Sequence, residues 1–285
     1  MSLQVSVLGS GSGGNVTVLR CTSGDYLIDA GLSAKQIVIR LEQMGVSPDN
    51  LAGIFLTHEH SDHTRGLDVF LRQRNIPIYA NALTKEALEY SIKSEIKWKV
   101  FQTGQAFTVD DMSVTAFPIP HDAAEPVGFI FKNEYACFGL VTDVGYITQS
   151  MRIHLREVDA LFVEANYDEA LLEADTKRPW ATKQRITSKH GHLSNTQAGE
   201  LIAAVGCEKL CHVLLGHLSS DCNNAQVALD TVSPFVQSVG NARLVCANQF
   251  EPTDWVKFGR EADLRNSKKQ IYAKLNGKLV QEELF

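Results

Sequence analysis

The feature that most constrains this chain is a dense group of metal-ligand side chains directly after a short apolar segment. Ile54-Phe55-Leu56 leads into Thr57-His58-Glu59-His60-Ser61-Asp62-His63, which places four ligand-type side chains in six positions. Neutral imidazole and carboxylate groups are ligands that Zn, Mn, Fe and related divalent ions share. Such a set rarely arises by chance in a solvated loop. The sequence therefore predicts a metal site at a strand end, built from His58, His60, Asp62 and His63.

Length and composition are those of a globular α/β protein. The chain has 285 residues, 44% of them hydrophobic, which is enough for a full core. We expect one domain over residues 1–285, with a charged segment at 258–285 in which Asn276-Gly277 signals a hairpin turn. The sequence contains no transmembrane run, and its first residues alternate like a strand, so we expect a cytoplasmic protein.

Cysteine spacing and net charge narrow the possible functions. The six cysteines lack zinc-ribbon spacing, and we expect reduced thiols at Cys21, Cys137, Cys207, Cys211, Cys222 and Cys246. A formal net charge of −6 argues against a surface that is basic overall, the usual footprint of a high-affinity nucleic-acid binder. This net charge does not exclude a local basic groove. The cationic stretch Lys177–Lys189 is a candidate, although alone it is typical of a solvated loop.

Hydrophobic periodicity predicts alternating strands and helices. Strands are expected at 3–8, 17–20, 26–29, 54–56, 78–80, 113–119, 127–131, 136–141, 160–164, 210–215 and 243–247. Helices are expected at 34–44, 66–74, 83–92, 147–156, 197–205 and 225–236. The glycine-rich segment 9–15 lacks the spacing of a nucleotide-binding loop and predicts a tight turn near the site. Ser194-Asn195-Thr196-Gln197 has the form of a capping box, which places His192 just before a helix.

Three further ligand-type residues follow predicted strands, namely His121, Asp143 and His217. Each of them alone could have a structural role. Together with the first group they form the series His58-x-His60-x-Asp62-His63, His121, Asp143, His217, which resembles the ligand series of metallo-β-lactamase fold hydrolases. The resemblance implies a four-layer αββα sandwich with the metals at one edge.

The resemblance also implies how the ligands divide between two divalent ions. His58, His60 and His121 would hold one ion, while Asp62, His63 and His217 would hold the second and Asp143 would bridge them. Asp62 would count among the catalytic residues as well. Zinc or manganese is expected ahead of iron or magnesium. The sequence does not identify the native metal, because imidazole and carboxylate suit several ions. The related flavodiiron oxidoreductases have a glutamate where this chain has His60, which favours the hydrolytic branch.

A second set of segments resembles phosphodiesterases of this fold. Gly191-His192-Leu193-Ser194 is similar to the Gly-His-Ser-Thr loop of ribonuclease Z, and Glu164 lies in a similar glutamate-containing strand. The similarity to the YycJ/WalJ group of 5′ to 3′ double-stranded DNA exonucleases is closer. It rests on Leu8–Asn15, Ile119–Gly128, Thr142–Tyr146, Glu164–Asp168 and Gly191–Asn195. His192 would contact the scissile phosphate and protonate the leaving oxygen, with His190 as the alternative.

These resemblances imply a double-stranded DNA exonuclease in which metal-activated hydroxide attacks phosphorus. Asp29 and Glu164 would lie behind the metal ligands, with Asp29 bonded to a ligand histidine. Lys183 and Arg185 would contact backbone phosphates. The alternatives are a phosphodiesterase for small or cyclic nucleotides, an acyl-bond (thioester or lactone) hydrolase, and a non-catalytic member of the fold. The native metal, the cleavage polarity and the oligomeric state stay open.

Overall fold

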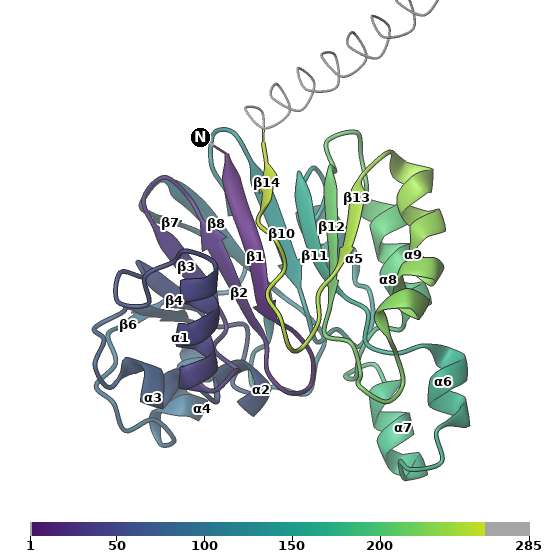
Figure 1. The fold of residues 1–285 in the computed structure, drawn as a ribbon, viewed down its shortest axis with the longest axis horizontal. Helices are drawn as coiled ribbons and strands as arrows, with labels where there is room; N and C mark the ends of the chain where they lie inside the picture. Colours follow the sequence, from purple (N-terminus) through teal and green to yellow (C-terminus); the bar gives the residue numbers. More distant parts are fainter. Residues whose placement is uncertain (1, 260–285) are drawn as a thin grey trace, which may run out of the picture.

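Residues 2–259 are described in a computed structural model of the chain, and they form two seven-stranded sheets packed face to face (Figure 1). The first sheet has the order β14 (Val256–Phe258), β1 (Leu3–Gly9), β2 (Val16–Arg20), β3 (Asp25–Ile28), β4 (Gly53–Phe55), β5 (Ile78–Ala80) and β6 (Trp98–Val100). The second has the order β13 (Arg243–Cys246), β12 (His212–Gly216), β11 (Ala160–Glu164), β10 (Cys137–Val141), β9 (Val127–Lys132), β8 (Met112–Pro118) and β7 (Ala106–Val109).

Each sheet contains a parallel half, β3 to β6 in the first and β10 to β13 in the second. The helices are α1 (Ala34–Gln43), α2 (Ser61–Thr64), α3 (Leu67–Leu71), α4 (Ala82–Glu89), α5 (Gln149–His154), α6 (Glu169–Ala174), α7 (Trp180–Ile186), α8 (Asn195–Val205) and α9 (Ala225–Val239). Parallel strands direct their carboxyl ends to the same edge of a sheet. Loops that follow these strands can therefore meet at one end of the molecule.

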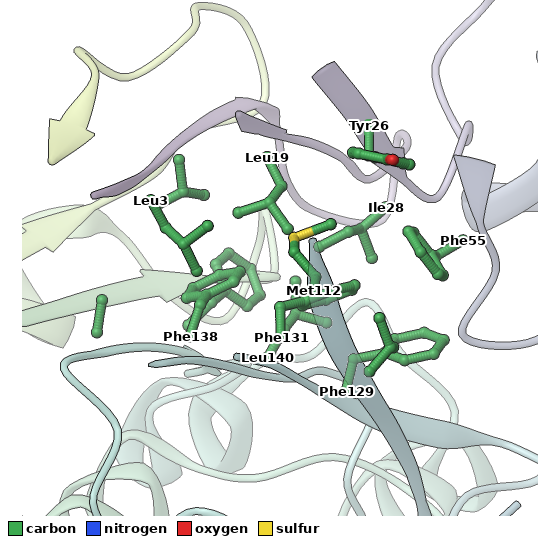
Figure 2. Close-up of a cluster of buried hydrophobic side chains, with 14 of the residues drawn as sticks. Leu3, Leu19, Tyr26, Ile28, Phe55, Met112, Phe129, Phe131, Phe138 and Leu140 are labelled. Atoms are coloured by element: carbon green, nitrogen blue, oxygen red, sulfur yellow. The ribbon is translucent and has the colours of Figure 1, made fainter. Parts of the chain in front are cut away.

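Three apolar layers hold the sheets and helices together. Between the sheets lies an aromatic cluster, in which the Phe55 and Phe131 ring centroids are 5.0 Å apart (Figure 2). A second cluster joins the outer face of the first sheet to α1 and α3, and a third joins the second sheet to α5, α8 and α9. The predicted αββα sandwich is confirmed.

Helix α8 packs closely against α9, and a capping box fixes its start. A side chain at Gly199 would meet the Phe235 ring at 2.3 Å, so the two helices can approach closely only with glycine there. The predicted capping box is present, with Ser194 accepting from the Gln197 amide and Gln197 accepting from the Ser194 amide. His192 consequently stands on a well-anchored turn.

Several elements differ from those predicted. The stretch Lys177–Lys189, expected to be a loop, contains α7, which begins after Pro179 and has no buried residue. Most residues of this stretch are polar, so apolar residues do not recur in it at helical spacing. Helices α2 and α6 and strands β6, β7 and β14 were also not predicted, since each is only three to six residues long. Figure 1 shows α6 and α7 projecting beyond the sheets, at the same end of the molecule as α2.

The expected hairpin at 271–282 lies outside the described residues, as does all but the start of the charged segment 258–285. Within residues 2–259, the structure contains no helix that is both long and apolar enough to cross a membrane.

Candidate metal centre

Ligand-type side chains from both sheets meet at the end of the molecule where the parallel strands terminate. The loop after β4 and the short helix α2 carry the first motif, and the loops after β8, β10 and β12 carry the rest. Their ligand atoms form two groups, each within 4.8 Å: His58, His60 and His121; and Asp62, His63, Asp143 and His217. The structure thus brings together all seven residues that the sequence predicted as ligands.

Asp143 lies between the two groups. Its Oδ2 is 3.1 Å from His63 Nε2, and its Oδ1 is 3.7 Å from His121 Nε2 and 3.4 Å from His217 Nδ1. A carboxylate has two oxygens that can reach different partners. This position suits a ligand shared by two ions.

The donor atoms fit a divalent cation. His58 is fully buried and its Nδ1 lies 3.0 Å from Thr57 Oγ1, yet its Nε2 has no hydrogen-bond partner among the described residues. An unpaired buried nitrogen is costly unless something binds it. His121 Nδ1 lies 3.1 Å from the Gly191 carbonyl oxygen, so its Nε2 is the nitrogen left to face the group. Imidazole nitrogens and carboxylate oxygens together match the preferences of Zn, Mn and Fe.

Electrostatics favour a cation in the second group. Burial by itself would lower the pKa of His217, but the charge of Asp143 and hydrogen bonds to Asp62 and Glu164 raise it to about 10. Burial opposes the Asp143 and Asp29 charges at His63 too, and the pKa of His63 is still raised well above its usual value. Without a metal these imidazoles would hold protons. An ion must displace those protons, so binding would strengthen as the pH rises.

Asp29 orients His63 from behind. Its Oδ2 lies 2.7 Å from His63 Nδ1, and its Oδ1 accepts the Thr57 amide at 2.9 Å. A carboxylate on the far nitrogen fixes the tautomer and orientation of a ligand histidine. Thr57 was not predicted, although its place directly before His58 was visible in the sequence. The contact expected between Asp29 and a ligand-type histidine is present, and its role behind a metal ligand stays a prediction.

The glycine-rich turn braces the ligand loop. Most of its amides are already bonded: Gly11 N donates to Asn15 Oδ1 at 2.9 Å, Gly13 N to Gln249 Oε1 at 2.8 Å, and Asn15 N to the Asp62 carbonyl at 2.7 Å. A phosphate cradle needs free amides. The expected tight turn near the site is confirmed, and its contact with Asp62 was not visible in the sequence.

Glu164 joins His192 to the candidate metal ligands. Its Oε2 is 3.0 Å from His192 Nδ1 and 2.9 Å from His217 Nδ1, and its Oε1 accepts the amides of Val144 and Leu193, both at 2.8 Å. Burial would raise the pKa of Glu164, but His192 and His217 lower it to about 2. An ionised carboxylate therefore holds His192 beside the ligands.

The two histidines near residue 191 have different surroundings. His192 is 19% exposed, and its Nδ1 is 3.7 Å from Asp143 Oδ1. The exposed His190 uses its backbone amide to bond Ser188 Oγ. Of these two residues, the structure thus ties His192 to the ligand network.

Backbone geometry marks the same site. Five described residues other than glycine have a positive φ, and three of them lie here, namely Asp29, Asp143 and His217 at +62°, +58° and +53°. Residues other than glycine rarely adopt this left-handed conformation, and it concentrates at functional sites. No sequence pattern in this chain signalled it.

The two candidate phosphate-binding residues face different directions. Arg185 Nε bonds Asp122 Oδ2 at 2.8 Å, next to His121, and its side chain is 65% exposed. Lys183 Nζ instead donates to the Glu173 carbonyl at 2.9 Å, on the side of α6. Residues two apart on a helix lie about 200° apart. The structure brings Arg185 to the rim of the centre and places Lys183 between α6 and α7.

Comparison with known proteins gives three findings. Residues 25–214 match the family model described as a β-lactamase superfamily domain. The chain is 36% identical to exodeoxyribonuclease YycJ of Bacillus anthracis over 84% of this chain and 91% of that protein. It is 35% identical to exodeoxyribonuclease WalJ of Streptococcus pneumoniae over 80% and 86%.

Among solved structures, the metallo-β-lactamase fold protein YhfI from Bacillus subtilis superposes with a TM-score of 0.68 at 18% identity, covering 89% of this chain and 99% of YhfI. The short form of human tRNase Z gives a TM-score of 0.60 at 19% identity, covering 88% and 98%. At these identities the two structures support the shared fold.

Proposed function

This chain belongs to the β-lactamase superfamily, and we propose that it is a metal-dependent phosphodiesterase that degrades double-stranded DNA from 5′ to 3′. Two proteins named exodeoxyribonucleases, YycJ and WalJ, align with most of its length and support the DNA substrate. The observation that carries the phosphodiester chemistry is the bond between His192 and Glu164 beside both ligand groups.

His192 is placed to move a proton. A carboxylate can only accept, so Nδ1 carries the hydrogen that bonds Glu164, and Nε2 is left to exchange a proton with substrate. A histidine so held can protonate the oxygen that leaves phosphorus. Divalent ions held by the seven ligands would supply Lewis acidity at the phosphate oxygens.

Other assignments extend this proposal. Zinc or manganese suits the imidazole-rich set, and iron or magnesium comes after them. Asp62, a ligand in the second group, would also count among the catalytic residues. A cytoplasmic location, where thiols stay reduced, remains a prediction.

Arg185 is our candidate for a backbone phosphate contact, because its exposed guanidinium lies at the rim of the centre. The expectation for Lys183 is weaker, since its ammonium is engaged with α6. The salt dependence of duplex binding separates the two. The logarithm of affinity falls as the logarithm of salt concentration rises, and each lost phosphate contact makes this negative slope shallower by about 1.

The substrate class is tested by supplying Mn or Zn and comparing end-labelled linear duplex, closed circular DNA, transfer RNA precursor and bis-p-nitrophenyl phosphate. Degradation of linear duplex with closed circles intact is expected, with release of a 5′ label before a 3′ label. Cleavage of bis-p-nitrophenyl phosphate alone would instead support a phosphodiesterase for small substrates. Bound metal with no cleavage of any phosphodiester would support a non-catalytic or acyl-hydrolysing protein.

The role of His192 is tested by His192→Ala, with His190→Ala as the matched control. Loss of general-acid catalysis typically costs about 10²- to 10⁴-fold in turnover. We expect a loss of that size for His192→Ala, with full metal content by elemental analysis, and nearly normal turnover for His190→Ala. If His192→Ala loses its metals, His192 is a ligand and the proposed role is wrong.

A further inference from the structure

Asp122 lies between the candidate ligand His121 and the exposed Arg185. Its Oδ2 accepts a hydrogen bond from Arg185 Nε at 2.8 Å, and its Oδ1 is 3.3 Å from His121 Nε2. The candidate bridging ligand Asp143 is farther from the same nitrogen, at 3.7 Å. An ion held through His121 Nε2 would therefore have the negative charge of Asp122 close by.

The backbone of Asp122 contacts another candidate ligand, His60. The Asp122 carbonyl oxygen is 3.1 Å from His60 Nε2. A carbonyl can only accept, so Nε2 carries the hydrogen and Nδ1 is the nitrogen left for an ion. Glu59 Oε1 accepts the Ala124 amide at 2.8 Å, which ties the same loop to the first motif. The loop that carries Asp122 is thus held against the candidate ligands by its backbone.

The first ligand group is made of imidazoles alone (His58, His60 and His121), whereas the second contains two carboxylates. Arg185 places a permanent positive charge next to the first group. A positive charge near a cation site lowers the affinity of that site for an ion, and a carboxylate between the two offsets the repulsion. Without Asp122, the guanidinium would therefore weaken ion binding at the group that has the least negative charge of its own.

The bond to Asp122 leaves most of the Arg185 guanidinium available. The bond uses Nε, and the two Nη groups have no partner among residues 2–259. The Arg185 side chain is 65% exposed. Because guanidinium donors form a planar fork that matches phosphate oxygens, Arg185 can bind a backbone phosphate while it stays paired with Asp122. DNA does not have to break this pair to reach the centre.

We propose that Asp122 is a positioning residue shared by the first ligand group and the DNA-binding rim. Its negative charge compensates the Arg185 guanidinium, so that this guanidinium can contact a DNA phosphate beside a bound ion. The inference rests on the proposed function. It adds that one carboxylate, which is not itself among the seven candidate ligands, keeps the phosphate contact compatible with tight ion binding.

The test compares Asp122→Asn, Arg185→Gln and the double variant with the wild type. Asp122→Glu keeps the charge, and Glu125→Gln is the control, because Glu125 is a partly buried carboxylate on the same loop. Affinity for Zn or Mn is measured by competition with a chromogenic chelator, at low salt and without DNA. The measurement therefore reports on Asp122 independently of turnover.

Asp122→Asn should bind one of its ions about 10-fold more weakly, the lower end of the usual effect of residues behind metal ligands, because the pair is partly exposed. Asp122→Glu and Glu125→Gln should stay close to the wild type. Arg185→Gln removes a positive charge and should not weaken ion binding. The double variant should bind the ion at least about twofold more tightly than Asp122→Asn, since the uncompensated guanidinium is gone. Added salt should shrink the loss in Asp122→Asn, because it screens exposed charges.

Duplex binding separates the two residues of the pair. The probe is a duplex whose phosphorothioate linkages resist hydrolysis, and the metal is kept at saturation. Arg185→Gln should make the negative salt slope shallower by about 1, because one phosphate contact is lost. Asp122→Asn retains the guanidinium and should retain the wild-type slope.

Equal ion affinity in Asp122→Asn and Glu125→Gln would overturn the inference. So would a double variant that binds the ion no more tightly than Asp122→Asn, because Asp122 would then act through the shape of its loop. A wild-type salt slope in Arg185→Gln would also overturn it, since the guanidinium would contact no phosphate. If the wild type binds ions but no duplex, the proposed DNA substrate fails. If the wild type degrades duplex normally and Asp122→Asn holds its ions as tightly as the control, the inference alone is wrong.

Discussion

Glu164 shows how much one buried carboxylate can organise. Its two oxygens contact the amides of Asp143, Val144 and Leu193 and the Nδ1 atoms of His192 and His217. It thereby fixes the proposed bridging ligand Asp143, the proposed ligand His217 and the proposed general acid His192. Removing one of two hydrogen-bonded partners in a buried site leaves the other unsatisfied, which costs more than the bond contributed.

Glu164→Gln should therefore damage metal binding and turnover together. The amide nitrogen cannot accept, so two or three of the donors at Glu164 lose their partner. Mutating a residue that supports metal ligands typically costs about 10- to 100-fold in affinity or activity. Competition with a chromogenic chelator measures the affinity, and bis-p-nitrophenyl phosphate measures turnover. The exposed Glu200 gives the control Glu200→Gln, and unchanged affinity and turnover in Glu164→Gln would refute the assignment.

At the scale of elements, α6 and α7 depend on one arginine at their junction. Arg178 bonds Asp175 Oδ2 at 2.7 Å and Asp221 Oδ2 at 2.8 Å, and its Nη1 is 3.3 Å from Cys222 Sγ. Asp221 and Cys222 belong to the loop 219–224, which follows the candidate ligand His217. Elements with few buried residues open most easily, and α7 has none buried.

Arg178→Ala should loosen the helix pair while leaving the metals in place. We expect several-fold faster amide hydrogen exchange in 169–186, weaker duplex binding, and little change in hydrolysis of bis-p-nitrophenyl phosphate. Arg156→Ala, an exposed arginine near the amino ends of β10 and β11, is the control. Exchange rates that stay the same in α6 and α7 would show that packing on Tyr167 holds the pair without Arg178.

The same elements show where sequence reasoning succeeds and where it stops. The strands next to the core were predictable because runs such as Leu214-Leu215 are apolar and end at glycine or a ligand. Helix α7 was not, because every residue in it is at least partly exposed and no apolar period exists. The first candidate ligands stood out because imidazole and carboxylate are metal-ligand side chains, and the resemblance to metallo-β-lactamase fold hydrolases added His121, Asp143 and His217. The groove between α6 and α7 forms where two short helices meet, and no local sequence pattern encodes that meeting.

At the scale of the molecule, the candidate metal centre lies across the join between the sheets. The first sheet contributes His58, His60, Asp62 and His63 through the loop after β4, and the second contributes His121, Asp143 and His217. Bound ions would therefore link the two halves of the sandwich. An unfolded chain cannot assemble this set, so binding energy becomes folding energy.

Metal removal should accordingly lower the thermal stability of the whole molecule. A ligand present at about 1,000 times its Kd stabilises the folded state by about 4 kcal/mol. We expect the unfolding midpoint, followed by circular dichroism, to fall when a chelator is added and to recover with Zn or Mn. Because His63 and His217 must lose protons to bind an ion, the recovery at a fixed metal concentration should be larger at pH 8 than at pH 6.

Asp143→Asn provides the control, because it removes the charge shared by both ligand groups and should abolish most of the metal-dependent shift. The ion that gives the largest shift at equal free concentration is the best candidate for the native metal. If the unfolding midpoint of the wild type changes neither with chelator nor with metal, the aromatic layer alone holds the two sheets together. In that case, ions would serve the chemistry without contributing to the fold.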